Sequence, residues 1–451
     1  MARILISIDH KWRDLPGYVY AALQLEAIGH QVYFTRNGFE PYYVVGVRPD
    51  LVIIGHLLDP QRQKFATELS DQGVLVVLMP TEGIPTLEGY RKYSAGYDND
   101  LSGVALHLVW NQPMADILYD NRSISRDKVR VVGCPRFDFY RLPLLNSLPT
   151  KEQFCRERQW QVKRPIVTFA TNFTQAQFHE RNQNFQKIDA ARLGYREVVE
   201  QLAGSLEDMS RKDYESREIL VNAFVRLVAE LEEVNFIIKL HPSEDHIYYF
   251  DLLRDRLKNF SDRVCIVTRA YIWDVLSITD VELKRSCTTG VESWMLGKPT
   301  IEMKLNPTEW YFSPEHASGS YIATNYDDLR EMTVSYLHGD PVAEDLVNKR
   351  FDFINRWCFA VDGARTQALV GEVDMLLKQA HRPRKIRFSL TRWLTWLALT
   401  LTDYRLHDAK VYGVFQMFSK SRIDKLGRID KYFNASDVSR LRTRLSAVIA
   451  K

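Results

Sequence analysis

Short apolar runs alternate with amphipathic stretches through the first 150 residues. The stretches between the runs, such as 18–29 and 61–73, have helical spacing and end in glycine, which commonly terminates a helix. Alternating strands and helices of this kind predict a parallel sheet with helices on both faces. The runs that we expect to be strands are rich in Val and Ile and cover residues 4–8, 30–35, 50–55, 74–80, 107–111 and 128–133.

The same alternation starts again after a polar, basic stretch. Residues 151–164 contain no apolar strand, and we interpret them as a linker. Two α/β units in tandem predict a cleft between them, because ligands of open α/β sheets bind beyond the carboxyl ends of the strands. The strands expected in the second unit cover residues 165–173, 235–242, 263–268, 278–286 and 299–305.

The pattern divides the chain into five parts. We predict an N-terminal Rossmann-like domain at 1–150, the linker at 151–164, a second Rossmann-like domain at 165–342, closing helices at 343–380 and a basic amphipathic tail at 381–451.

Composition narrows the class of protein. Hydrophobic residues make up 45% of the 451-residue chain and charged residues 26%, as in folded globular proteins. The five cysteines are scattered without metal-ligand spacing, which indicates free thiols in a reducing compartment and no metal site. The N-terminal MARILISID is typical of a first buried strand, not of a signal peptide, and favours the cytoplasm.

The net charge of +3 hides an asymmetry. Residues 382–451 hold 16 Lys and Arg against 5 Asp and no Glu, a net of +11, whereas the first 381 residues hold 44 basic and 52 acidic residues, a net of −8. A basic tail on an acidic body indicates a polyanionic partner. No nucleic-acid-binding motif accompanies it, so we expect no nucleic-acid partner.

Residues 382–405 combine basic and aromatic side chains. The apolar segment from Trp393 to Leu401 is far shorter than the roughly 20 residues that span a bilayer. Two alternatives stay open: a helix lying on the inner membrane surface, or a helix packed on the body of the protein with a solvated basic face.

The stretch CTTGVESWMLGKP, residues 287–299, follows an expected strand and begins a helix. Backbone N–H groups at a helix N-terminus favour phosphate, the hydroxyls of Thr288 and Thr289 add donors, and Gly290 allows close approach of a ligand. Glu292 could accept hydrogen bonds from a ribose diol. The alternative is a capping box, in which Thr289 caps the helix and Glu292 reaches back to it.

A second motif, KLHPSED (239–245), lies where another expected strand ends. His241 precedes a proline and is therefore held out of the helical region. A histidine at this edge of the sheet can donate to a phosphate or to a departing group. Together the two motifs favour a nucleotide site over a simple helix cap.

These motifs resemble a known group of proteins. KLHP, CTTGVESWMLGKP and VVGCPRFDFYR (131–141) are similar to the bacterial surface carbohydrate biosynthesis proteins, the capsule-assembly Kdo transferases and the polyol-phosphate transferases of teichoic-acid synthesis. The resemblance implies the α/β glycosyltransferase GT-B fold, in which two Rossmann-like domains face a cleft. Further short matches extend it over nearly the whole chain, namely HKWRDLPG (10–17), TEG (81–83), TNF (171–173) and DKYFNASDV (430–438).

The resemblance also implies roles for individual residues. The second domain would bind the donor, with His241 and Lys239 near the phosphate, Asn172 on the floor of the site, and Thr288, Thr289, Gly290 and Glu292 around phosphate and ribose. The first domain would bind the acceptor near Arg13, Asp14 and Arg136, with Glu82 as the acid or base at the acceptor hydroxyl.

One departure from the Kdo transferases concerns the loop that opens the second domain. In them this loop carries acidic residues, whereas here it reads TNFTQAQF. A nucleophile from that loop is therefore in doubt, and Asp189, Asp208 and Asp213 stay open as alternatives.

The preferred function is a glycosyltransferase that moves Kdo or a related ulosonic acid from a CMP-sugar to a glycan or lipid-linked glycan of capsule or lipopolysaccharide, without a metal or other cofactor. The alternatives are a polyol-phosphate transferase with a CDP-linked donor, a nucleotide-sugar epimerase and an inert assembly protein. The basic tail favours a transferase that lies peripherally on the inner face of the cytoplasmic membrane.

Overall fold

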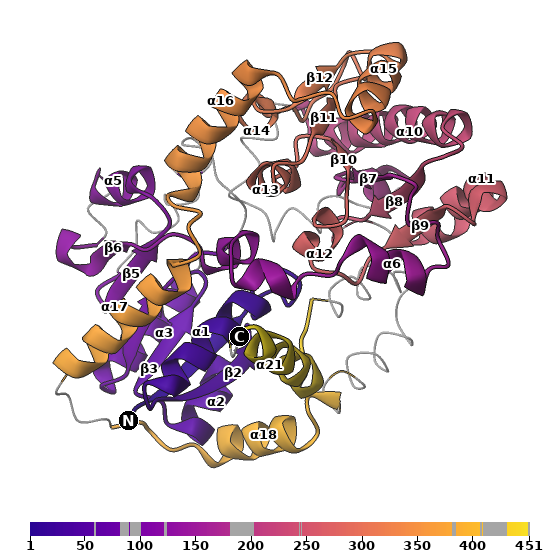
Figure 1. Ribbon diagram of the computed structural model, residues 1–451. Helices are drawn as coiled ribbons and strands as arrows, with labels where there is room; N and C mark the ends of the chain where they lie inside the picture. The colour runs from indigo at the N-terminus through magenta and orange to yellow at the C-terminus, as the bar shows by residue number, and fades with distance from the viewer. Residues whose placement is uncertain are drawn as a thin grey trace. The chain divides into compact units, whose positions relative to one another are not determined.

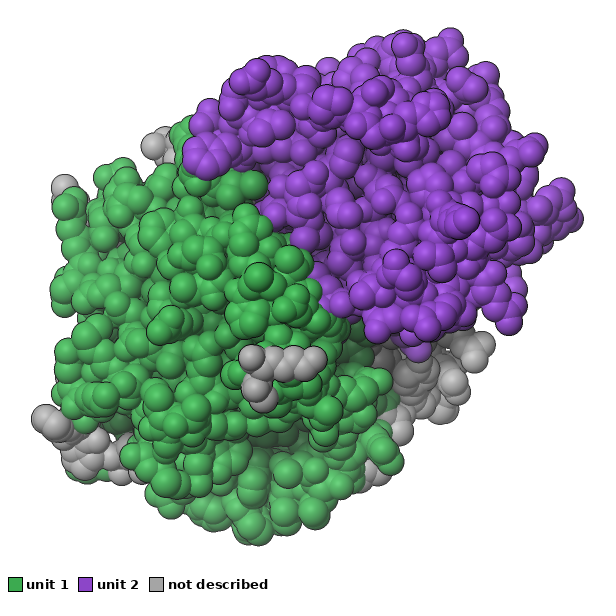
Figure 2. Space-filling model, in the orientation of Figure 1, with its two compact units in different colours: residues 1–147, 354–422, 429–451 green, residues 148–353, 423–428 purple. Residues whose placement is uncertain are grey.

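A computed structural model describes residues 1–57, 60–81, 90, 101–120, 124–180, 203–242, 244, 246–380, 385–405, 408 and 431–449. The described chain forms two compact units (Figures 1 and 2). Unit 1 takes in residues 1–147 together with the described residues after 353, and unit 2 takes in the described part of residues 148–353.

Unit 1 contains a six-stranded parallel sheet in the order β2-β1-β3-β4-β5-β6. The central strands are apolar along their whole length because helices cover both faces of a parallel sheet. Leu51, Val52 and Ile53, for example, are fully buried. The strands are β1 (Arg3–Ile8), β2 (Gln31–Arg36), β3 (Leu51–Ile54), β4 (Leu75–Leu78), β5 (Leu106–Val109) and β6 (Val129–Val131).

The helices of unit 1 come from both ends of the chain. α17 and α21 pack on α1, and α18 packs on α2. The bounds are α1 (Leu15–Ala27), α2 (Glu40–Val47), α3 (Pro60–Asp71), α5 (Gln112–Asp120), α17 (Arg365–Gln379), α18 (Leu390–Leu401) and α21 (Ala435–Ile449), with short 3₁₀ turns η1 (Arg126–Lys128), η2 (Pro135–Tyr140) and η3 (Leu144–Ser147) and the π-helical turn η7 (Ile354–Cys358).

Unit 2 contains a second six-stranded parallel sheet in the order β12-β11-β10-β7-β8-β9. This is the strand order of a Rossmann sheet, and the direction of winding reverses between β7 and β10. The strands are β7 (Ile166–Ala170), β8 (Asn235–Lys239), β9 (Val264–Val267), β10 (Val281–Lys284), β11 (Thr300–Met303) and β12 (Tyr321–Ala323).

The long helix α10 covers one face of this sheet. Its Leu220, Phe224 and Leu227 are fully buried against the strands. The helical segments of unit 2 are α6 (Lys151–Glu157), α7 (Ala176–Glu180), α10 (Leu206–Glu230), η5 (Tyr248–Leu253), α11 (Arg254–Leu257), η6 (Lys258–Phe260), α12 (Ile272–Leu276), α13 (Thr289–Met295), α14 (Pro314–Ala317), α15 (Tyr326–Leu337) and α16 (Glu344–Phe353).

The predicted α/β class and parallel sheets are confirmed, and the structure adds β12. Residues 151–157, assigned to a linker, instead form α6, because Thr150 and Gln153 make a capping box and Phe154 and Cys155 are buried in unit 2. The segment 343–380 is shared, since α16 belongs to unit 2 and α17 to unit 1. Of the described helices, none is long and apolar enough to cross a bilayer.

Candidate functional site

The carboxyl edge of the unit 2 sheet brings the predicted donor residues close in the fold. Asn172 follows β7, His241 follows β8, and Thr288 follows β10. β7 pairs with both β8 and β10, so these three loops are neighbours at one edge. They flank the point where the winding reverses, which is where open α/β sheets bind ligands.

A buried arginine holds two of these loops. Arg285, 1% exposed, donates to the Asn172 carbonyl at 2.7 Å, to Asp213 Oδ1 at 2.6 Å and to Glu309 Oε2 at 2.8 Å. Burial alone would lower the pKa of Arg285, but the two carboxylates raise it above its ordinary value. The guanidinium therefore stays charged and ties the loop after β7 to the loop after β10.

The other oxygen of Asp213 is also engaged. Asp213 Oδ2 accepts from the backbone N–H groups of Gln175 at 2.8 Å and Ala176 at 3.1 Å. Asp213 is 1% exposed, and both of its oxygens accept hydrogen bonds within the site. Its contacts are those of a residue that holds the loops together, which differs from the nucleophilic role considered above. Asp208 lies in the first turn of α10, paired with Arg211, and Asp189 lies outside the described residues.

Glu244, which sequence reasoning did not single out, joins the loop after β8 to the loop after β7. One oxygen accepts from the Phe173 N–H at 2.8 Å and the other from the Tyr249 hydroxyl. Burial raises the pKa of Glu244 to about 7. The signal in the sequence was an acid two residues after a His-Pro turn, which is too common to be selective.

His241 and Lys239 differ in their surroundings. The His241 backbone N–H donates to Thr171 Oγ1 at 3.2 Å, which fixes the backbone at the strand end, and the residue is partly exposed. Lys239 is 7% exposed and its ammonium donates to the Leu240 carbonyl at 2.9 Å. Burial lowers the pKa of Lys239 to about 8. Lys239 therefore stabilises the carboxyl edge of the sheet as a buried residue of unit 2.

The first turn of α13 does not contain the capping box that was the alternative to a nucleotide site, since Thr289 lies inside the helix. Thr288 is the N-cap residue and its side chain makes no capping hydrogen bond. The Thr289 hydroxyl is buried and lies near the Glu282 carboxyl, whose pKa burial raises to about 6. Glu292 is 4% exposed, so a ribose could reach its carboxylate only after a local rearrangement.

Packing requires a glycine at position 290, which the sequence did not reveal. A Cβ at this position would lie 2.2 Å from Lys284 Cε, so the space that we assigned to a ligand is filled by a lysine side chain. Lys284 is fully buried and its ammonium donates to Glu302 Oε2 at 2.6 Å and to the His316 carbonyl at 3.0 Å. Lys298 precedes β11 and therefore lies at the opposite edge of the sheet, away from the predicted donor residues.

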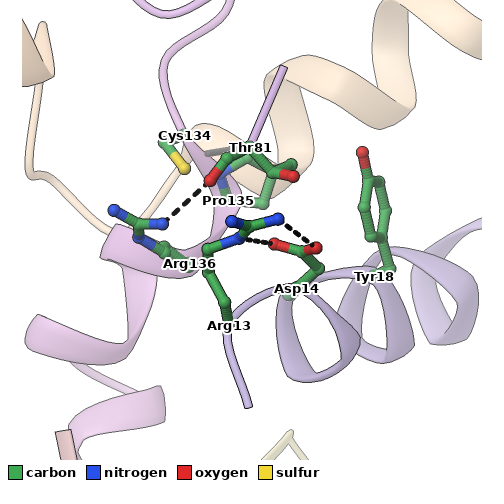
Figure 3. A pocket seen from close by; sticks show the side chains of 8 residues that line it. Arg13, Asp14, Tyr18, Thr81, Cys134, Pro135 and Arg136 are labelled. Carbon is green, nitrogen blue, oxygen red and sulfur yellow. Dashed lines mark hydrogen bonds and ion pairs between the residues drawn. The ribbon is translucent and has the colours of Figure 1, made fainter. Parts of the chain in front are cut away.

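In unit 1 the predicted acceptor-side residues come together around one pocket (Figure 3). Arg13, Asp14 and Arg136 line it with Tyr18 and Thr81 at the carboxyl edge of the sheet; Gly17, Cys134 and Pro135 complete the lining. The space admits about one water molecule, so it fits a single polar group of a ligand.

Ion pairs and hydrogen bonds fix the side chains of this pocket. Arg13 donates to both oxygens of Asp14, at 2.6 and 3.0 Å, and Asp14 Oδ2 also accepts from the His10 N–H at 3.0 Å. Arg136 donates to the Thr81 carbonyl at 2.9 Å. Glu82 is the next residue in the chain, and it lies outside the described residues.

Among the described residues, no group of three or more His, Cys, Asp and Glu side chains is placed to hold a metal ion.

Neither the family models nor the curated proteins searched match the sequence. Solved structures do match. The wall teichoic acid polymerase TagF is 13% identical, with 84% of this chain and 90% of that chain covered and a TM-score of 0.53. A TagF variant with one histidine replaced, soaked with CDPG, gives 13% identity, the same coverage and a TM-score of 0.52.

The MnaA structure from S. aureus, solved with UDP, is 12% identical, with 86% of this chain and 100% of that chain covered and a TM-score of 0.50. The chain has the GT-B fold. At these identities the likeness extends to the fold alone, and it confirms the fold that the sequence motifs implied.

Proposed function

We propose that the protein is a glycosyltransferase that uses a nucleotide-activated donor and acts on a surface glycan or a lipid-linked glycan in the cytoplasm. The observation that carries this proposal is the carboxyl edge of unit 2, where three loops at the reversal point are held together by Arg285 and Glu244. Nucleotides bind at such points in Rossmann sheets.

The donor side is built from two groups of residues. His241, Asn172 and Thr288 lie on the loops and would contact the phosphate and ribose of the donor. Lys239, Thr289 and Glu292 lie beneath them and would hold the edge in shape, since the polar groups of their side chains are buried. Gly290 would do so by leaving room for the Lys284 side chain.

The acceptor side would be the unit 1 pocket. The two guanidiniums of Arg13 and Arg136 would orient a polar group of the acceptor, with Asp14 holding Arg13 in place. Glu82 remains our candidate for the base that takes the proton from the attacking acceptor hydroxyl. We propose no metal in this reaction, since the helix dipoles and the His241 imidazole could balance the phosphate charge.

A CMP-linked ulosonic acid such as Kdo is our preferred donor, on the resemblance of the sequence motifs. The CDPG soak of TagF and the UDP in MnaA make a CDP-linked polyol donor and a UDP-sugar epimerase the alternatives to test. An inert assembly protein is the alternative outside the enzymes.

Thermal unfolding of the full chain with CMP, CDP, UDP and GDP tests the proposal. A nucleotide at 100 times its Kd should stabilise the protein by about 2.7 kcal/mol. CMP selectivity would support the preferred donor, CDP selectivity the polyol-phosphate transferase and UDP selectivity the epimerase.

His241→Ala should lower the stabilisation by the nucleotide that the wild type prefers. His338 is an exposed histidine of the same unit, and His338→Ala should leave that stabilisation unchanged. If no nucleotide raises the unfolding temperature, the transferase proposal fails and the assembly protein is favoured.

A further inference from the structure

Helix α18 has two apolar faces, of which one packs on unit 1. Helix α18 lies beside α2 (Figure 1). Leu399 is 5% exposed, and the Trp396 indole lies so close to Gly46 of α2 that a Cβ there would be 2.0 Å from Trp396 Cδ2. Trp396 therefore anchors α18 to unit 1.

The second apolar face is exposed to solvent. Leu390, Leu394 and Leu401 are 59%, 51% and 76% exposed. An α-helix advances about 100° per residue, so these three leucines lie within one narrow stripe on the side opposite Leu399. Phe388, 67% exposed, precedes the helix. We name Phe388, Leu390, Leu394 and Leu401 the leucine face.

Basic residues gather at the N-terminal end of the leucine face. Lys385 and Arg387 are exposed there, directly before Phe388, and the sequence has no Asp or Glu between Asp374 and Asp403. An apolar stripe beside cations is typical of a helix that lies in the surface of an anionic bilayer.

The described acids of the tail are engaged elsewhere in unit 1. Asp403 accepts from the Ala435 N–H at the start of α21, Asp408 pairs with Arg36 at 2.7 Å, and Asp437 pairs with Lys11 at 3.3 Å. These acids therefore hold the tail on unit 1.

We propose that α18 is the surface by which this protein docks on an anionic lipid bilayer. The leucine face enters the boundary between headgroups and acyl chains, and Lys385 and Arg387 contact lipid phosphates. Twelve residues are too few to span the bilayer, so the helix lies in its plane. A second copy of the chain fits less well, because it would bring two basic clusters together.

This inference goes beyond the transfer reaction and does not depend on it. Co-sedimentation of the full chain with vesicles tests it directly. The protein should bind vesicles that contain phosphatidylglycerol and bind phosphatidylcholine vesicles weakly, with binding that weakens as salt rises.

Leu394→Ser with Leu401→Ser should lower binding to the anionic vesicles at least about tenfold, since both side chains are exposed and would be buried only on the membrane. Phe351→Ser is the matched control, because Phe351 is 66% exposed on α16 and should not contribute. Lys385→Gln with Arg387→Gln should lower binding about tenfold on anionic vesicles alone, and Lys349→Gln should not.

Circular dichroism and the unfolding temperature check that these exposed substitutions leave the fold intact. Equal vesicle binding by the wild type and the leucine variant would overturn the proposal. So would a concentration-dependent dimer that the leucine substitutions abolish while vesicle binding is absent, because the face would then cover a second copy.

Discussion

Glu244 shows how one buried side chain organises the candidate donor site. It joins two loops through its two oxygens, and it lies in the same buried edge as Lys239, whose pKa burial lowers to about 8. Groups whose pKa values are shifted toward neutrality cluster at functional sites more often than elsewhere. The role of Glu244 can therefore be tested through the stability of the protein as well as through its activity.

The free energy of unfolding should depend on pH through Glu244. Its folded-state pKa is raised from 4.5 to about 7, so the folded protein holds the proton more tightly than the unfolded chain. The contribution of Glu244 to stability is present below about pH 4.5 and is lost as the pH rises toward 7.

In Glu244→Gln this part of the pH dependence of the unfolding free energy should disappear. Glu232 is an exposed acid of the same unit, and Glu232→Gln should retain the pH dependence of the wild type. Urea unfolding of the three proteins between pH 4.5 and 8 measures the difference. Parallel curves for the wild type and Glu244→Gln would contradict the assignment.

Gly290 shows what the sequence could not reveal at this scale. The Thr-Thr-Gly-x-x-Glu motif was placed at the end of a strand, where the structure has it. The directions of the side chains in this motif depend on Lys284 and Glu302, which lie on two neighbouring strands of the sheet. No local pattern connects Gly290 to these residues, so its packing role stayed hidden.

Gly290→Ala should lower the free energy of unfolding by about 2–4 kcal/mol. The added Cβ would push Lys284 from Glu302 and leave a buried carboxylate without its counter-ion. Gly371→Ala is the control, since a Cβ at that helical glycine meets nothing within 4 Å and should be neutral or slightly stabilising. Chemical denaturation measures both, and similar effects of the two substitutions would contradict the packing role of Gly290.

At the scale of elements, the strands were the most predictable part of the molecule. Runs such as DLVIIG and NFIIKL are apolar on both sides because both faces of a parallel sheet are covered, and that pattern is local. β12 has only three residues, of which Ile322 is 39% exposed, so its pattern was too weak. α6 was missed because the residues that bury its apolar side lie on distant strands, such as Ile237.

The contact between α2 and α18 gives a prediction at this scale. Gly46→Ala should displace α18, because its Cβ would overlap the Trp396 ring. We expect a loss of about 1–3 kcal/mol of stability, as for other overpacked sites. Amide hydrogen exchange should become faster in residues 390–401 of this variant.

Gly371→Ala again serves as the helical control, and exchange in residues 390–401 should be the same as in the wild type. Unchanged exchange in Gly46→Ala would show that α18 does not depend on this contact.

At the scale of the whole molecule, the sequence predicted two α/β units, and the structure distributes the chain between them differently. The helices that follow residue 353 complete unit 1, as the Arg442–Glu26 ion pair at 2.6 Å illustrates. Such contacts join residues more than 400 positions apart, and no periodicity or local motif predicts which unit a distant helix joins.

Nucleotide binding should act on one unit alone. CMP should slow amide exchange in residues 171–176, 240–242 and 285–292 of unit 2 and leave the strands of unit 1 unchanged, since the proposed donor residues all lie in unit 2. Exchange measured by mass spectrometry with and without CMP tests this.

Adenosine monophosphate serves as a control nucleotide in the same experiment. Protection confined to unit 1 would contradict the division between donor and acceptor sides.

The way the chain closes unit 1 has a consequence for its synthesis on the ribosome. Arg36 at the end of β2 donates to the Phe433 carbonyl at 2.9 Å, and the Lys11 N–H donates to the Lys431 carbonyl at 2.8 Å. Residues 1–147 therefore leave the ribosome long before the segment that completes their packing, whereas residues 148–353 emerge together. Unit 1 is the first part to be started and the last to be completed, and a nascent chain stalled before residue 431 would expose its unfinished surface to chaperones.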